Sequence, residues 1–387
     1  MQNKLQIPSK KKLEICSSIN EIPKADYQKL HNDNPFMSYD FLWSLENSGC
    51  ASDAFGWIPN HFIQTDESGH IACFSPAYIK YNSFGEYVFD HVWADFYNKV
   101  NIRYFPKLLI AIPFTPIRSS KFLTKLDNID IKVNSIKAMK SFLDNYDLSS
   151  VHINFIRDEE VTILKQNNFL IRTSKQFIWE NQNYNNFDDF LNSLNARKRK
   201  MINKERRKLH SDGIYFERVN GQNITDDLLA TFFKHYLDTC NRKWGNAYLN
   251  KNFFENLVDR IPDNLLLIIA KNDQNTIGTS LHLHGHDTLY GRYWGASGFY
   301  KFLHYELCYY QAIEYAIENR ILTIESGAGG SHKISRGYKP TFTYSAHFFQ
   351  NQKIHSIISE FIEKEGEYIG KEVDYLSNFN PFKNTED

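Results

Sequence analysis

The stretch from residue 287 to residue 327 constrains the fold more than any other part of the sequence. It reads as an aromatic strand, DTLYGRYWGASGFY, then a helix over residues 302–320, then a short strand in ILTIESG. Apolar side chains recur at helical spacing through the helix, at Phe302, Tyr305, Tyr309, Ile313 and Ile317. Predicted helices precede this stretch and a further strand follows it. The order predicts an α/β (α+β) fold in which helices flank a mixed sheet.

A weaker version of this pattern occurs in the first half of the chain. In both halves a hairpin with a polar turn leads into an aromatic segment, EYVFDHVWADFY in the first half and DTLYGRYWGASGFY in the second. Trp93 and Trp294 occupy similar places in these segments, and each precedes a small residue. We interpret both segments as strands and infer a duplicated unit.

The chain length of 387 residues is suited to two domains rather than to one core. The duplication places their boundary near residue 180. The expected organisation is an N-terminal tail over 1–15, a first domain over 16–180, a second domain over 181–365 that includes a basic helix at 189–211, and a C-terminal tail over 366–387.

Charge and cysteine content limit the partners and the compartment. The 45 basic and 45 acidic residues balance, so any basic patch must be local. The five cysteines form no CxxC pair, which is typical of reduced thiols in the cytosol. The N-terminal sequence lacks the apolar core of a secretion signal, and no apolar run reaches the ~20 residues of a membrane span. We therefore expect a cytoplasmic protein without a membrane-spanning helix.

The predicted basic helix carries an apolar stripe and a dense set of cations on its other faces. These cations are Arg197, Lys198, Arg199, Lys200, Lys204, Arg206, Arg207 and Lys208. They fit a solvated surface, a nucleic-acid patch, or a clamp for the phosphates of a ligand in a cleft. The charge balance elsewhere favours the clamp, and its candidate cofactor-binding residues are Arg197, Lys198, Arg199 and Lys200.

The glycine-rich loop after the short strand is a candidate active-site loop. Its glycines allow the backbone to approach a ligand, but the sequence matches neither a phosphate-binding P-loop nor a dinucleotide-binding fingerprint. Glu325 ends the strand and His332 follows the glycines, so both are candidate catalytic residues for proton transfer. Pairing of Glu325 with Lys333 or Arg336 is the structural alternative. Lys333, Arg336 and Tyr338 are candidate substrate-binding residues.

Arginine and acidic residues among aromatic side chains supply the other candidates. Strict alternation would place Tyr290, Arg292 and Trp294 on one face of their strand. The remaining candidate substrate-binding residues are Arg242, Lys243 and Trp244 in the second half, and Glu86 and Asp90 in the first. The HLHGH segment lacks a further ligand, so we expect half-buried strand histidines there and no metal site.

Several long segments resemble the FemAB-like N-acyltransferases, a GNAT-superfamily group associated with peptidoglycan biosynthesis or recognition. They include NPFMSYDFLWSLENSG, NSFGEYVFDHVWAD, LNARKRKMINKERR, RKWGNAYL, LYGRYWGA, LHYELCYYQAIEYAIE and ESGAGGSHKISRGYKP. The similarity runs from about residue 34 to residue 347. It implies two tandem GNAT-like domains and the transfer of an acyl or aminoacyl group to an amine.

The resemblance also implies where the acyl donor binds. The strand LYGRYWGA is similar to the GNAT strand whose splayed edge receives the donor, and the helix from about Phe302 is similar to the one that faces the donor's phosphates. The SGFYKFLH segment before that helix departs from the usual signature for coenzyme A. The candidate donors are therefore acyl-CoA and aminoacyl-tRNA, with tRNA as a candidate partner.

The implied chemistry is attack by a neutral amine on an activated carbonyl. Glu325 or His332 would accept the amine proton, and strand N–H groups or Arg292 would stabilise the oxyanion. The amine acceptor would be a cell-envelope precursor. The alternative is a non-catalytic recognition module that binds an anionic ligand, such as RNA or a cell-wall precursor, through the basic helix.

Overall fold

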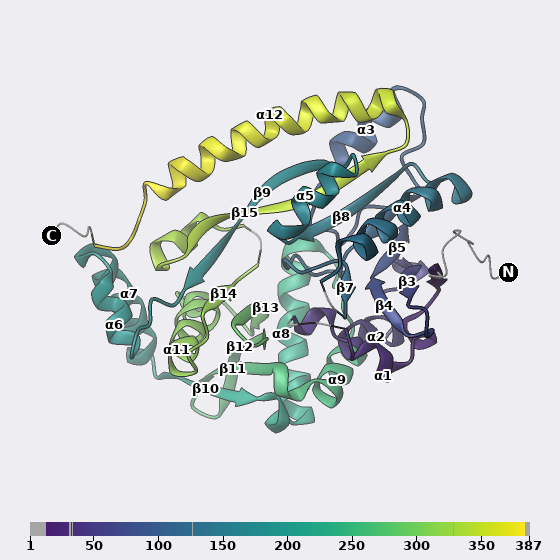
Figure 1. The fold of residues 1–387 in the computed structure, drawn as a ribbon. Coiled ribbons are helices and arrows are strands. Elements are labelled where there is room, and N and C mark those ends of the chain that lie inside the picture. Colours follow the sequence, from purple (N-terminus) through teal and green to yellow (C-terminus); the bar gives the residue numbers. More distant parts are fainter. Residues whose placement is uncertain (1–12, 31, 33, 126, 328, 384–387) are drawn as a thin grey trace. The chain divides into compact units, whose positions relative to one another are not determined.

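The computed structural model describes the chain except for residues 1–12, 31, 33, 126, 328 and 384–387, and the side chains of Lys243 and Trp244 (Figure 1). The fold divides into two compact units, each built from two stretches of sequence. The first unit comprises Met1–Ser174 and Phe342–Gly370, and the second comprises Lys175–Thr341 and Lys371–Asp387. The chain passes between them within β9 (Leu170–Glu180), β15 (Lys339–Phe349) and α12 (Gln352–Ser377).

The first unit contains two sets of strands. One sheet has the order β1-β3-β4-β7 and the other set has the order β15-β8-β6-β5-β2. Their bounds are β1 Leu13–Cys16, β2 Ile58–Pro59, β3 His61–Thr65, β4 Ile71–Ser75, β5 Ala77–Lys80, β6 Lys107–Ile110, β7 Leu123–Thr124 and β8 Ser150–Ile156. The main helices are α2 (Tyr39–Asn47), α3 (His91–Lys99), α4 (Ile129–Tyr146) and α5 (Asp158–Gln166).

The second unit is built on strands in the order β10-β11-β12-β13-β14-β9. Their bounds are β10 Ile214–Asn220, β11 Leu265–Asn272, β12 Asn275–His284, β13 Thr288–Ala296 and β14 Thr323–Glu325. The helices are α6 Phe187–Ser193, α7 Ala196–Ser211, α8 Asp226–Trp244, α9 Lys251–Arg260, α10 Leu303–Tyr305, the π-helical turn η6 Glu306–Tyr310, and α11 Gln311–Glu318. The 3-10 helix η7 (Ser331–Arg336) follows the glycine loop. In Figure 1, α8 runs alongside β12 and β13.

Both units repeat one strand–helix–strand arrangement. In the first unit β6 pairs in parallel with β8, and α4 lies between them in the sequence. In the second unit β13 pairs in parallel with β14, and the helical run from α10 to α11 lies between them. Parallel neighbours need such a crossover, so each unit contains one strand–helix–strand motif of this kind.

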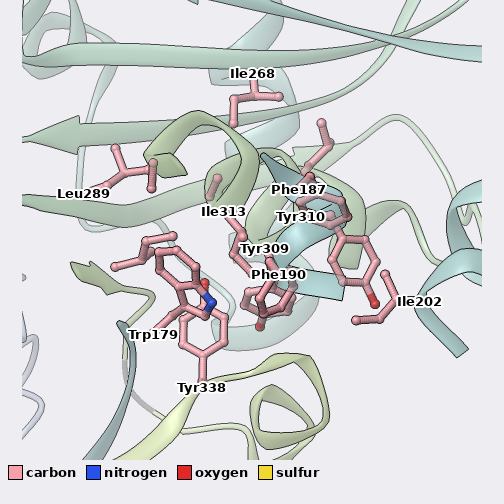
Figure 2. Packing of buried hydrophobic residues seen from close by; sticks show 14 of the residues in the cluster. Trp179, Phe187, Phe190, Ile202, Ile268, Leu289, Tyr309, Tyr310, Ile313 and Tyr338 are labelled. Atoms are coloured by element: carbon pink, nitrogen blue, oxygen red, sulfur yellow. The ribbon is translucent and has the colours of Figure 1, made fainter. Parts of the chain in front are cut away.

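The core of the second unit forms where the crossover helix covers the sheet (Figure 2). Tyr310 and Ile313 come from this helical run, and Leu289 comes from β13. Phe187 and Phe190 of α6 pack against them. The apolar positions that recur at helical spacing therefore fix the helix to the strands on either side of it.

Helix caps formed by side chains explain where several helices begin. Thr225 accepts a hydrogen bond from the backbone N–H of Leu228, as the sequence predicts for the start of α8. Asn195 likewise accepts from the N–H of Lys198 and begins α7. The basic cations thus lie on a helix, but the single helix expected over 189–211 is interrupted: residues 189–193 belong to α6, and α7 begins at Ala196.

The aromatic segment EYVFDHVWADFY of the first half is not a strand, which corrects the sequence-based expectation. It contains α3, and Trp93 and Tyr97 are its buried residues. These two side chains lie four residues apart and pack in one cluster with Phe349, so helical spacing decided the conformation. Trp93 and Trp294 therefore occupy different elements, α3 and β13, and do not mark equivalent strands.

The two expected tails also differ from the structure where it describes them. Residues 13–16 form β1, which pairs antiparallel with β3, while residues 1–12 lie outside the described part. At the other end, α12 continues to Ser377. The N–H of Asn195 then donates to Pro381 O, and the N–H of Lys383 donates to Ser193 O, both over 2.9 Å. Phe382 packs against the second unit's core, which accounts for the order of this segment.

Candidate active site

The two parallel strands β13 and β14 separate soon after they pair. Their pairing covers only Thr288–Tyr290 against Thr323–Glu325, after which β14 ends while β13 continues to Ala296. The gap opens into a cavity of about 70 Å³. We call it the fork cavity, and its lining includes Gly291, Arg292 and Trp294 of β13, His282 of β12, Tyr309 of η6, and Ser326.

A β-bulge in β13 shapes the fork cavity. Leu281 pairs with Tyr293 while His282 pairs with Gly291, so Arg292 is the extra residue. Each bulge reverses the alternation of side chains. The expectation that Tyr290, Arg292 and Trp294 share one face is therefore wrong: Tyr290 is opposite Leu283, whereas Trp294 is opposite Ser280. The ring of Trp294 packs at a tilt against that of His304, with 4.5 Å between the ring centroids.

His282 supplies a polar side to the fork cavity. The hydroxyl of Ser280 donates to Leu307 O over 3.0 Å, and the same oxygen lies 2.9 Å from Nε2 of His282. Because the single hydroxyl proton is used by the carbonyl, Nε2 must carry a proton and donate to Ser280. Nδ1 is then an acceptor, and no described residue gives it a hydrogen bond. Burial lowers the pKa of His282 to about 4, so the ring is neutral.

His282 was missed by the sequence analysis, which interpreted it as a half-buried strand histidine. It is only 1% exposed. The available signal was its spacing of two residues from Ser280, which places both side chains on one face of β12. Nothing in the sequence indicated that Gly291 would stand beside it and leave Nδ1 open to the fork.

Of the two predicted catalytic residues, His332 is connected to the fork cavity. The hydroxyl of Tyr309, which lines the cavity, lies 2.9 Å from Nε2 of the exposed His332. Burial raises the pKa of Tyr309 far above its usual value, so the hydroxyl keeps its proton. Glu325 is buried at the end of β14. It alternates with Ile324, which packs in the core, so Glu325 points to the other face of the sheet.

Lys333 and Arg336 are buried side chains that hold the glycine loop in place. The ammonium of Lys333 donates to Ser326 O and Gly327 O over 2.9 and 2.8 Å, and burial lowers its pKa to about 8. Arg336 donates to both oxygens of Glu205 of α7 at 2.9 Å and stacks 3.5 Å from the ring of Tyr305. The sequence left open that Lys333 or Arg336 pairs with Glu325. Their hydrogen bonds go instead to loop carbonyls and to Glu205.

Tyr338 is fully buried and packs in the core beside Tyr309, at 5.5 Å between ring centroids (Figure 2). It also lines a second cavity in this unit, of about 1060 Å³, together with Tyr184, Lys339 and Phe382. This cavity does not include the fork residues. Tyr338 therefore supports the site through packing.

The cations of α7 divide into structural and exposed groups. Arg206 binds Glu306 and Glu314 at 3.0 Å, and Lys198 donates to Ser335 over 2.8 Å. Burial, helped by the charge of Arg197, lowers the pKa of Lys198. Arg197 and Lys200 are exposed and Arg199 is half-buried. Of the four predicted cofactor-binding residues, Lys198 is thus tied to the loop helix η7.

The remaining sequence candidates lie outside the fork cavity. Arg242 is exposed near the end of α8 and pairs with Asp238 at 2.8 Å, while the side chains of Lys243 and Trp244 lie outside the described part. Glu86 and Asp90 belong to the first unit, where both bind the buried ammonium of Lys107. Burial raises the pKa of Glu86 to about 7. Their contacts are those of a buried ion cluster.

Among the residues that the structure describes, no three His, Cys, Asp or Glu side chains cluster in a way that could hold a metal ion. The described helices include none with the length and apolar character needed to cross a bilayer.

Comparison with solved structures shows what the fold resembles. The C-terminal domain of a proposed lysylphosphatidylglycerol synthetase from Agrobacterium fabrum has a TM-score of 0.53 at 9% identity, covering 88% of this chain and 97% of that one. FemX has a TM-score of 0.52 at 13% identity, covering 92% and 100%. L-PGS from Bacillus licheniformis has a TM-score of 0.50 at 10% identity, covering 86% and 98%. The chain thus shares the overall fold of these proteins, and its helices and mixed sheet form the α/β (α+β) fold that the sequence predicts.

No curated protein matches the sequence closely enough to be reported as a relative. A family model does match, and it carries the description peptidoglycan biosynthesis/recognition. Its match covers residues 18–384, nearly the whole chain. The chain therefore belongs to the FemAB-like family.

Proposed function

We propose that this protein is a transferase that moves an acyl or aminoacyl group to an amine at the fork between β13 and β14. The observation that carries the proposal is the separation of these strands around a cavity with a neutral histidine on one side and an arginine on another. Family membership and the folds shared with FemX and L-PGS support a transferase.

The reaction we propose begins with a neutral amine attacking the donor's carbonyl carbon. A C–N bond forms and negative charge builds on the carbonyl oxygen, where the guanidinium of Arg292 would stabilise it. The bond to the donor's oxygen or sulfur then breaks. The amine proton passes to the Tyr309 hydroxyl as that hydroxyl gives its own proton to His332, whose exposed ring returns it to solvent or to the leaving group.

The donor would be acyl-CoA or an aminoacyl-tRNA, and both carry phosphates. The helical run that begins at Leu303 carries the positive end of its dipole at this start, next to the exposed Lys301. Arg197 and Lys200 of α7 add exposed positive charge in the same unit. We propose these groups as the phosphate contacts and, from the family description, a peptidoglycan precursor as the amine acceptor.

The test is a transfer assay with variants that fill the fork. The full-length protein is incubated with a panel of acyl-CoA and aminoacyl-tRNA donors and amine acceptors, and products are identified by mass spectrometry. A Cβ on Gly291 would lie 3.5 Å from Nδ1 of His282, an ordinary contact, so Gly291→Ala tests a small intrusion and Gly291→Leu fills the cavity. We expect Gly291→Leu to lower turnover by about a hundredfold or more, and Gly291→Ala by much less.

Gly366→Ala is the matched control, because nothing lies within 4 Å of its added Cβ. Equal turnover by wild type and Gly291→Leu would place the chemistry elsewhere. RNA or precursor binding that weakens with salt, without product from any donor, would favour the recognition module instead.

A further inference from the structure

We propose that Nδ1 of His282 binds the attacking amine of the acceptor, in its neutral form, within the fork cavity. The inference deepens the proposed function and rests on it. Neither the family description nor the sequence analysis assigns His282 a role. It rests on three observations within the second unit: the fixed tautomer, the unmatched acceptor and the composition of the cavity.

The hydrogen-bond chain fixes the direction in which His282 can bind a ligand. Leu307 O can only accept, so Ser280 donates to it and must accept from His282. The chain therefore ends in a lone pair on Nδ1. The backbone carbonyl at the other end of the chain can only accept a hydrogen bond. The direction of the whole chain is therefore fixed, and the ring presents an acceptor to the fork.

The unmatched acceptor indicates that something else completes the site. His282 is 1% exposed, and Nδ1 has no partner among the described residues. A buried polar atom without a hydrogen bond costs about 1–3 kcal/mol, so such atoms are rare in folded proteins. A ligand that donates a hydrogen bond would remove this cost on binding.

The chemistry of the cavity selects the kind of donor. A carbonyl, carboxylate or thioester offers only acceptors, and would face the lone pair of Nδ1 unfavourably. A primary amine offers N–H donors and still has its own lone pair free for attack. Arg292 is among the residues that line the same cavity, and its positive charge disfavours an ammonium ion there. The volume of about 70 Å³ admits only the end of a substrate, which fits an amino group on an unbranched carbon.

A pair of isosteric variants separates Nδ1 from the rest of the ring. In His282→Asn the amide oxygen can take the position of Nδ1, whereas in His282→Gln the amide reaches the position of Nε2 and leaves no acceptor at Nδ1. Because one hydrogen bond is at stake, we expect His282→Gln to raise KM for the amine about tenfold, with KM for the donor unchanged. His282→Asn should stay close to wild type. Equal amine KM in wild type and His282→Gln, or equal defects in both variants, would overturn the inference.

A binding measurement on the unmodified full-length chain tests the inference without relying on turnover or on variants that fold. The probe is glycinamide near pH 8, where an α-amino group is about half neutral. The ¹⁵N spectrum of the histidine side chains should show a protonated Nε2 and a bare Nδ1 for His282, with the Nδ1 resonance shifting on glycinamide addition. An Nδ1 signal that does not move contradicts the inference even if transfer occurs. Absence of transfer with a shifting Nδ1 signal contradicts only the proposed reaction.

Discussion

Tyr309 connects a buried cavity to a solvent-exposed histidine, and this link assigns roles to the two predicted catalytic residues. The hydroxyl of Tyr309 reaches His332, whereas Glu325 points to the opposite face of the sheet. Our proposal therefore uses His332 as the final proton acceptor and gives Glu325 no part in proton transfer. His332 is exposed on a loop helix and is not among the residues that line the fork cavity, whereas Tyr309 is.

Tyr309→Phe tests this link because it removes one hydroxyl and keeps the ring that packs in the core. We expect turnover to fall by about a hundredfold, since proton transfer to a positioned group contributes that much or more. Glu325→Gln should remain near wild type. Steady-state kinetics of Tyr309→Phe and Glu325→Gln beside the wild type is the measurement. The opposite ranking of the two variants would return the proton-transfer role to Glu325.

Lys333 predicts a specific dependence of stability on pH. Its pKa falls from 10.5 to about 8 on folding because the ammonium is buried. Below about pH 8 it is charged in both states, and the folded state carries the full cost of the buried charge. As pH rises towards 10.5, the folded protein releases the proton first, so the free energy of unfolding should rise by about 3 kcal/mol.

Urea unfolding between pH 7 and 10 measures this effect, with Lys333→Met as the reference that cannot titrate. The wild type should gain stability relative to Lys333→Met as pH increases. A constant difference between the two curves would show that Lys333 has an ordinary pKa.

Single residues were predictable where local chemistry decides, and less so where distant partners do. Thr225 as the cap of α8 follows from its own neighbours. The pairing of Arg336 with Glu205 joins positions 131 residues apart, and no local pattern signals it. The sequence predicts that Arg336 and Lys333 bind substrate. Their burial could not be predicted, because it depends on how α7 and η7 meet.

At the scale of elements, close packing of β13 on α8 depends on a glycine. A Cβ on Gly295 would stand 1.9 Å from the backbone oxygen of His235, so α8 would have to move. Gly295→Ala should lower the free energy of unfolding by about 3 kcal/mol or more through overpacking. Urea titration is the measurement. Gly366→Ala, with open space around its Cβ inside α12, should be neutral or more stable by up to about 1 kcal/mol. Similar midpoints for both variants would refute the close contact.

The elements around the site show why type was easier to predict than detail. Helical spacing identified the crossover helix, and aromatic and β-branched residues identified β12 and β13. The bulge at Arg292 was not predicted, although Gly291 inside the strand is the kind of residue that often marks one. Yet it reverses the faces of Tyr290 and Trp294. The predicted strand at EYVFDHVWADFY failed for a related reason: its aromatic residues satisfy a strand pattern and a helical pattern, and tertiary packing of Trp93 and Tyr97 selected the helix.

At the scale of the whole molecule, each unit is completed by a segment from late in the sequence. Residues 371–387 belong to the second unit, where Phe382 packs against the core and Pro381 and Lys383 bond to the backbone around α6 and α7. A division into two units could be expected from the chain length, whereas this exchange could not, because α12 has a continuous helical pattern across the crossing point.

Deleting residues 378–387 should therefore destabilise the second unit. The loss of Phe382 packing and of two backbone hydrogen bonds predicts a decrease of about 2 kcal/mol, measured as a lower midpoint in thermal unfolding. Deletion of residues 384–387 alone keeps Phe382 and is the control. Identical midpoints for the two deletions would mean that this segment contributes nothing to the fold.

The central claim is that acyl transfer takes place between β13 and β14. The most direct measurement is a crystal structure of the full chain with a non-reactive analogue of the donor found in the transfer assay. We predict electron density for the acyl or aminoacyl group in the fork, with its carbonyl beside Arg292 and β13 and β14 still parted after Tyr290. Density for that group at any other position, or β13 and β14 paired along the rest of β13, would contradict the account.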